Sequence, residues 1–154
     1  MSNAPLMTHE EMDALMDEHL AAEAAGDVDR VIATFAENVE HDIVGPGDVP
    51  VVFGVDAVRL RYDSLFKNIQ VVDRKQFRRA HGDNVLTDDS MLTVKVIGRM
   101  GPMEGGGRTI SFRMFHVVEM AHGKIVRENV WFDTAGIARE LAAVETQSNN
   151  AAAD

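Results

Sequence analysis

Five side chains able to take part in acid/base chemistry fall where the sequence pattern predicts a shared interior. They are two histidines, two acids and the one tyrosine of the chain: His19, Asp42, Tyr62, His116 and Glu128. Burying one polar group without a partner costs about 1–3 kcal/mol, so a chain rarely keeps several inside unless they pair or have a use. Carboxylates and imidazoles in a water-poor cavity are suited to moving protons and to stabilising developing negative charge.

Alternation along two predicted strands places part of this set. In segment 108–120 the more apolar face consists of Ile110, Phe112, Met114, His116 and Val118. In segment 124–132 one face carries Glu128, Val130 and Phe132. We therefore expect His116 to point inward, and we expect a binding wall for a small molecule formed by Phe112, Met114, Glu128, Val130, Phe132 and the nearby His41.

The other candidates lie on predicted helices and at the end of a short strand. Thr8 and Glu11 have the spacing of a capping box, and Gly26 is suited to ending the helix that begins there. His19 lies on the apolar face of this helix, and Tyr62 lies on the apolar face of a helix that begins at Asp56. Asp42 follows His41 at the end of the stretch 39–44, just before the Gly/Pro-rich loop 45–54.

Each candidate also has a purely structural interpretation. Asp42 could anchor the loop after it through backbone N–H groups. Glu128 would be a surface residue if the strand register slipped by one. A buried histidine can simply be a hydrogen-bonded core residue. A metal site built from His19, His41, His116 and Asp42 or Glu128 is a further alternative, although no short-range ligand motif supports it, and we expect no metal.

The order of the elements predicts an α+β domain, in which N-terminal helices pack across a curled antiparallel sheet and enclose a mostly apolar pocket. We expect a disordered leader at 1–7, one domain at 8–145 and a disordered tail at 146–154. Besides the helices above, the pattern predicts a helix after Asp27, strands at 71–80, 84–97, 108–120 and 124–132, and a last helix from Asp133 to Leu141.

Composition restricts the possible functions. The chain has 154 residues, no cysteine and a formal charge of −10, and residues 1–40 hold ten acids and one base, Arg30. An acidic surface repels phosphate backbones and anionic lipid, so we expect neither nucleic acid nor a membrane as a partner. No thiol or disulfide chemistry is possible. Without a signal-like segment, the cytoplasm is the expected location.

Three segments give the chain a family resemblance: FAENVEHD at 35–42, GVDAVR at 54–59, and the stretch from Gly123 through Trp131 and Asp133 to Leu141. It resembles the nuclear transport factor 2-like superfamily, and within it the SnoaL-like polyketide-cyclase and ketosteroid-isomerase branch. This resemblance implies a cone-shaped domain with a deep pocket that often forms a homodimer through the outer sheet face.

The resemblance also implies roles for individual residues. Asp42 matches a proton-shuttling aspartate, Tyr62 matches a supporting tyrosine, and His19 and His116 match two groups that stabilise an oxyanion. The chain departs from the pattern because the two oxyanion positions hold histidine, where the isomerases have tyrosine and an acid. It also has Val130 where cyclases place an acid.

We therefore expect a cofactor-free acid/base enzyme acting on a small, largely apolar carbonyl, polyketide, steroid-like or aromatic substrate. Asp42 would abstract a proton, His19 and His116 would stabilise or protonate the developing oxyanion, and Tyr62 would orient one of them. Isomerisation, cyclisation, dehydration and lyase cleavage all need these parts. The alternative is a non-catalytic ligand-binding or dimeric association domain of the same fold.

Overall fold

The N-terminal caps fold as the sequence pattern predicts. The structure is a computed structural model that describes residues 5–45 and 49–151. In α1 (His9–Ala25), Thr8 N–H donates to Glu11 Oε2 at 2.7 Å, and Glu11 N–H donates to Thr8 Oγ1 at 3.2 Å, which is the reciprocal capping box. Gly26 ends α1 with φ +65°, a left-handed conformation that glycine adopts without strain.

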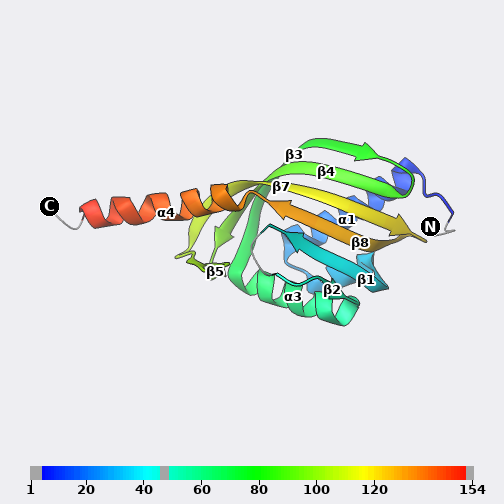
Figure 1. The fold of residues 1–154 in the computed structure, drawn as a ribbon, viewed down its shortest axis with the longest axis horizontal. Helices are drawn as coiled ribbons and strands as arrows, with labels where there is room; N and C mark the ends of the chain where they lie inside the picture. Colours follow the sequence, from blue (N-terminus) through cyan, green and yellow to red (C-terminus); the bar gives the residue numbers. More distant parts are fainter. Residues whose placement is uncertain (1–4, 46–48, 152–154) are drawn as a thin grey trace.

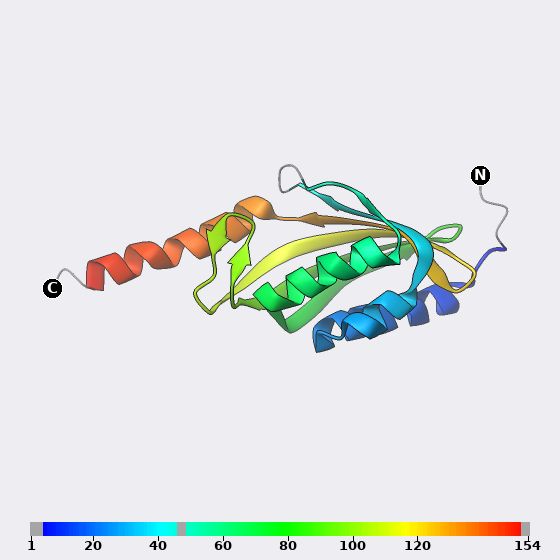
Figure 2. The ribbon, with the colours of Figure 1, turned by 90° about the horizontal axis from the view of Figure 1, so that it is seen from below.

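Four helices and eight strands make up the described chain. The helices are α1, α2 (Val28–Thr34), α3 (Val55–Asn68) and α4 (Thr134–Ala151). The strands are β1 (Phe35–Val44), β2 (Val52–Phe53), β3 (Ile69–His81), β4 (Val85–Val96), β5 (Arg99–Met100), β6 (Met103–Glu104), β7 (Arg108–Ala121) and β8 (Lys124–Phe132). The predicted α+β class with a curled sheet is confirmed. Figure 2 shows α1, α2 and α3 on one face of that sheet.

The large sheet has the strand order β2-β1-β8-β7-β4-β3. It is mixed rather than purely antiparallel, because β1 pairs with β8 in parallel, while its other pairs are antiparallel (Figure 1). After β1 and β2 the chain passes through α3 to the opposite edge of the sheet, where β3 begins a meander that returns to β8. The parallel contact therefore joins residues from opposite ends of the domain, and local pattern gives no signal for it.

Two predicted boundaries differ from the structure. The last helix was expected to end at Leu141, but α4 continues to Ala151, so most of the segment 146–154 that was predicted to be disordered is helical. The stretch after Leu141 contains no glycine or proline that would stop a helix. Of the predicted leader, residues 1–4 lie outside the described residues, whereas Met7 N–H donates to Asn84 Oδ1 at 2.7 Å and Met7 packs against the core.

Two loops contain short strands that the pattern did not indicate. β2 lies in the Gly/Pro-rich loop and pairs with β1, and β5 and β6 form a hairpin inside the loop between β4 and β7. Asn68 fixes the base of this hairpin, since its Oδ1 accepts from Arg99 N–H at 2.9 Å. The hairpin residues Met100 and Met103 pack against the core, so this loop forms part of the interior wall.

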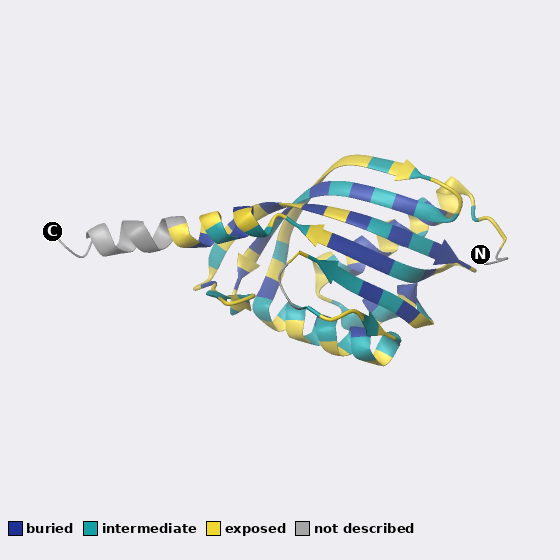
Figure 3. Cartoon of the chain, viewed as in Figure 1, coloured by how far each residue is buried: buried dark blue, intermediate teal, exposed yellow. Residues whose placement is uncertain are grey.

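The inward face of the sheet carries the core, and the outward face carries exposed aromatic residues. Figure 3 shows buried residues alternating with intermediate ones along β4 and with mostly exposed ones along much of β7. Phe77, Phe115 and Trp131 are exposed on β3, β7 and β8, and the rings of Phe115 and Trp131 lie 6.2 Å apart. The homodimer expected through this outer face stays a prediction. None of the described helices has the length and apolar character that a membrane crossing requires.

Candidate active site

A cavity of about 820 Å³ lies between α3 and the inward face of the sheet. Its wall is mostly apolar, and it includes the hairpin residues Met100 and Met103 and, from α4, Ile137. This volume is within the range of small-molecule sites, which bind apolar ligands and orient them with a few polar groups. Here the polar groups on the wall include Glu23, His41, Arg61, Tyr62 and His116.

The predicted faces of β7 and β8 are confirmed. Phe112, Met114 and His116 of β7 and Val130 and Phe132 of β8 all line the cavity. Phe112 and Phe132 meet edge to face with ring centres 5.8 Å apart. Glu128 also points inward but is fully buried behind this wall. Alternation of period two placed all six residues correctly, because each strand has one clearly more apolar face.

Glu128 stands at the centre of a group of titratable side chains. His41 Nε2 lies 3.3 Å from Glu128 Oε2, and His19 Nε2 lies 3.4 Å from Glu128 Oε1. The Tyr62 hydroxyl is 3.5 Å from Oε2, and His116 Nε2 is 3.8 Å from Oε1. Three imidazoles and a phenol from four different elements therefore surround one buried carboxylate.

Glu23 adds a second carboxylate that the sequence pattern did not single out. The Tyr62 hydroxyl donates to Glu23 Oε1 at 2.7 Å, and His19 Nε2 lies 3.4 Å from the same oxygen. The available signal was its spacing of four residues from His19, which puts both on one helix face. We call Glu128, Glu23, His19, His41, Tyr62 and His116 together the Glu128 cluster.

The pKa values within the cluster move in directions that fix its charges near neutral pH. Burial lowers the pKa of His19, but Glu128 and Glu23 more than offset this and raise it to about 10. Burial alone would raise the pKa of Glu128, yet His19 and His41 hold it well below its usual range. Burial, together with the two carboxylates, raises the pKa of Tyr62, so its hydroxyl stays protonated.

His116 is in a different state from His19. Burial lowers the pKa of His116, so its imidazole is neutral at pH 7. Its Nδ1 is buried and has no hydrogen-bond partner among the residues that the structure describes. A neutral imidazole on a cavity wall with a free nitrogen can accept a proton from a bound molecule.

The predicted interior position of Asp42 is wrong. β1 is in register with β8 so that His41 lies opposite Glu128 and Asp42 lies opposite Asn129. Successive strand residues point to opposite faces, so His41 faces the cavity and Asp42 faces away from it. Asp42 Oδ2 instead accepts from Asn129 Nδ2 at 3.0 Å, and Asp42 is not part of the cavity wall. The interior position that was assigned to Asp42 is occupied by its neighbour.

His19 and Tyr62 lie in the interior as predicted, and they differ in access. His19 is completely buried, and its Nδ1 lies 2.9 Å from Thr34 Oγ1. Because the Thr34 hydroxyl donates to the Val31 carbonyl at 2.6 Å, it accepts from His19 Nδ1–H. Tyr62 lines the cavity, whereas His19 lies behind its wall.

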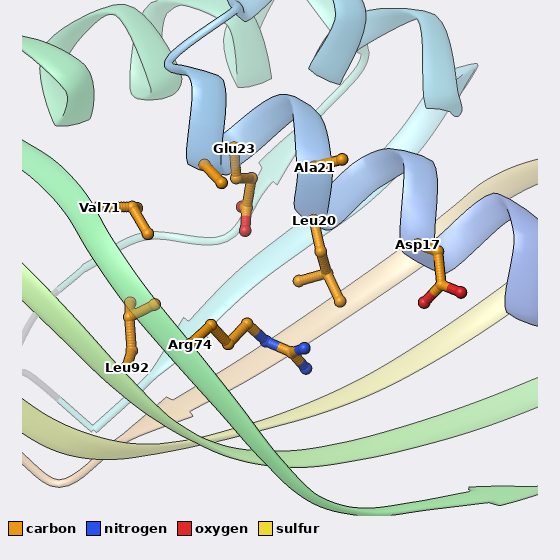
Figure 4. Close-up of a pocket in the computed structure, with 8 residues that line it drawn as sticks. Asp17, Leu20, Ala21, Glu23, Val71, Arg74 and Leu92 are labelled. Atoms are coloured by element: carbon orange, nitrogen blue, oxygen red, sulfur yellow. The ribbon is translucent and has the colours of Figure 1, made fainter.

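A second, smaller cleft of about 240 Å³ opens between α1 and β3. Figure 4 shows Asp17, Leu20 and Glu23 of α1 facing Val71, Arg74 and Leu92 across it. Glu23, Val71 and Leu92 line both this cleft and the large cavity. Glu23 is therefore the member of the Glu128 cluster that borders both spaces.

Metal coordination was the further alternative for these side chains. Within residues 5–45 and 49–151, no group of three or more His, Asp or Glu side chains is arranged so that it could hold a metal ion.

Comparison with known proteins shows the family. The model of the SnoaL-like domain matches residues 16–128, which is more than half of the chain. The chain belongs to the SnoaL-like domain family. No curated protein matches this SnoaL-like chain significantly.

Solved structures share the SnoaL-like fold at low sequence identity. TsrD from Streptomyces laurentii is 16% identical, with a TM-score of 0.75 over 89% of this chain and 98% of that one. An LEH-like epoxide hydrolase from M. tuberculosis is 16% identical, with a TM-score of 0.69 over 87% and 91%. A provisionally named polyketide cyclase from Xanthomonas campestris is 16% identical, with a TM-score of 0.72 over 86% and 97%. At such identity these likenesses show the fold alone.

Proposed function

We propose that this SnoaL-like protein is a cofactor-free acid/base enzyme, an isomerase, cyclase or lyase, acting on a small, largely apolar carbonyl compound. One observation carries the proposal: a largely buried cluster of two carboxylates, three imidazoles and a phenol adjoins a mostly apolar cavity of about 820 Å³. A packed core does not need so many titratable groups in contact, and clusters of this kind are typical of catalytic sites.

His116 is the proposed general base. It is neutral, it lines the cavity, and its free Nδ1 can take a proton from a carbon next to the substrate carbonyl. Glu128, close to His116 Nε2, stabilises the imidazolium that forms. The same proton then returns to a different atom in an isomerisation, or the carbanion attacks or expels another group in cyclisation or cleavage.

Tyr62 is the proposed hydrogen-bond donor to the carbonyl oxygen. Its hydroxyl stays protonated and lies on the cavity wall, where it can shift from Glu23 to an enolate oxygen that develops negative charge. The apolar wall excludes water and strengthens this interaction. Names of structural neighbours favour an enzyme as well, since they include an epoxide hydrolase and a provisionally named cyclase.

Deuterium incorporation tests the proton abstraction without knowledge of the natural substrate. A panel of cyclic and aryl ketones with exchangeable α-hydrogens is incubated with the protein in D₂O, and deuteration is followed by NMR. We expect exchange of at least one ketone, and we expect His116→Asn to reduce its rate by about 10²–10⁴-fold.

The matched control is His122→Asn, which changes an exposed histidine in the turn after β7. The backbone of His122 is left-handed, with φ +52°, a conformation that asparagine tolerates. Its exchange rate should equal that of the wild type. If no ketone exchanges, or if the His116 variant exchanges as fast as the control, the proposed function is wrong.

A further inference from the structure

The three imidazoles of the Glu128 cluster differ in what their second nitrogen contacts. His19 Nδ1 donates to the Thr34 hydroxyl at 2.9 Å. His41 Nδ1 lies 2.8 Å from an Arg61 NH1 nitrogen. His116 Nδ1 has no partner among the described residues. All three point Nε2 toward the same carboxylate, so these second contacts decide how the histidines differ.

Arg61 restricts His41 to one protonation pattern. A guanidinium has only donors, so His41 Nδ1 must be the acceptor in this contact. The single proton of His41 is then on Nε2, the nitrogen that lies 3.3 Å from Glu128 Oε2. Neither the Nδ1–H tautomer nor the doubly protonated imidazolium is compatible with the position of Arg61.

The guanidinium is held in place by three acceptors. Besides His41 Nδ1, its NH1 donates to the His41 carbonyl at 3.1 Å, and its NH2 donates to the Pro50 carbonyl at 2.5 Å. Burial lowers the pKa of Arg61, but a guanidinium remains charged at neutral pH. The planar guanidinium thus bridges β1 and the segment before β2. Moving it away from His41 would break these hydrogen bonds.

We propose that Arg61 is a positioning residue that fixes His41 as the Nε2–H tautomer and thereby leaves His116 as the proton-accepting imidazole of the site. With both nitrogens engaged, His41 serves as a fixed donor to Glu128. Glu128 stays a carboxylate and attracts the proton of His116 to Nε2, so that His116 Nδ1 keeps its lone pair. The assignment of the base to His116 rests on the proposed function, while the tautomer of His41 does not.

Nitrogen-15 NMR of histidine-labelled protein reads the tautomer directly. In the wild type at pH 7, His41 should show an unprotonated Nδ1 and a protonated Nε2, with the signals assigned from a His41→Gln variant. In Arg61→Met, the wild-type pattern of His41 should be lost, because no donor then requires Nδ1 to be an acceptor. Arg61→Lys, whose ammonium also only donates, should keep the wild-type pattern.

Arg59→Met is the matched control. Arg59 lies two residues earlier on α3 and donates to Asp29 at 2.6 Å instead of facing the cavity. Arg59→Met removes the same charge as Arg61→Met and should leave the His41 signals unchanged. A protonated Nδ1 in the wild type would overturn the proposal without any variant, and so would an unchanged His41 pattern in a folded Arg61→Met protein.

The two proposals can fail separately. The His41 signals need no substrate, so they can confirm the tautomer even if no ketone exchanges deuterium. Conversely, His116-dependent exchange with a protonated His41 Nδ1 would leave the proposed function intact and refute the role of Arg61. If both hold, Arg61→Met should shift the pH dependence of the exchange rate, whereas Arg59→Met should not.

Discussion

Two carboxylates are fully buried on the inward face of the same sheet, and their surroundings differ. Asp88 on β4 and Glu128 on β8 lie on either side of β7, and Asp88 is directly opposite His116. Asp88 binds two arginines, since Arg74 NH2 donates to Oδ1 and Arg79 Nε donates to Oδ2 at 3.0 Å. Glu128 instead faces three imidazoles and a phenol at 3.3–3.8 Å.

The difference in partners distinguishes a carboxylate that stabilises the fold, Asp88, from one that is suited to acid/base chemistry, Glu128. The arginine partners of Asp88 cannot release a proton near neutral pH, and Arg79 also binds Asp13 and Asp17 at 3.0 and 2.9 Å, which ties α1 to β3 and β4. The partners of Glu128 are imidazoles and a phenol, which are side-chain types used in proton transfer, and its Oε1 accepts no hydrogen bond from the described residues. We therefore take a buried carboxylate as a sign of acid/base chemistry when its partners are imidazoles or phenols. We take it as part of a structural ion pair when its partners are arginines.

Removing the charge of Asp88 should have the largest effect on stability. Asp88→Asn leaves the largely buried guanidinium of Arg74 without its carboxylate and takes one of three carboxylates from Arg79, which costs about 3–5 kcal/mol. Glu128→Gln should cost less, because His19 can release its proton when this carboxylate is removed. Urea unfolding of both variants at pH 7 measures the two changes in the free energy of unfolding. Equal losses, or a larger loss for Glu128→Gln, would contradict the distinction.

The pH dependence of stability should follow His19. Its pKa is about 10 in the folded protein against an ordinary 6.5, so its contribution is complete below pH 6.5 and is lost as the pH rises through 10. Glu128 has a lowered pKa, so its contribution is present above pH 4.5 and is lost as the pH falls through the folded value.

The free energy of unfolding, measured from pH 4.5 to 10, tests this linkage. The wild type should lose more stability between pH 6.5 and 10 than His19→Asn, whose side chain does not titrate. Titrating groups outside the Glu128 cluster are common to both proteins and cancel in the difference. Parallel curves would show that His19 carries no extra proton in the folded state.

Replacing Asp42 should have the smallest effect. Asp42→Asn alters a hydrogen bond to Asn129 on the outward face and removes a charge that interacts with Arg61, and we expect a stability change within about 0.5 kcal/mol and unchanged deuterium exchange. Chemical denaturation and the ketone assay measure both quantities. A loss of exchange comparable with that of His116→Asn would indicate that Asp42 is the base. It would contradict the inference that the β1–β8 register excludes Asp42 from the site.

Local pattern sufficed for much of the fold and for part of the site. The capping box at Thr8, the left-handed Gly26 and the alternation along β7 and β8 act over a few residues, so the chain itself encodes them. This is why His116 and Glu128 could be placed in the interior beforehand. His19 and Tyr62 followed in the same way from helical faces with a clear apolar side.

Tertiary structure decided which of two adjacent polar residues faces inward and which side chains that residue contacts. His41 and Asp42 are both polar, so alternation alone could not choose between them, and the parallel register of β1 on β8 made the choice. Glu23, Arg61 and Asp88 gained their roles only from residues distant in sequence. The physical reason is that a charge or a tautomer depends on groups a few ångströms away, and those groups come together only when the chain has folded.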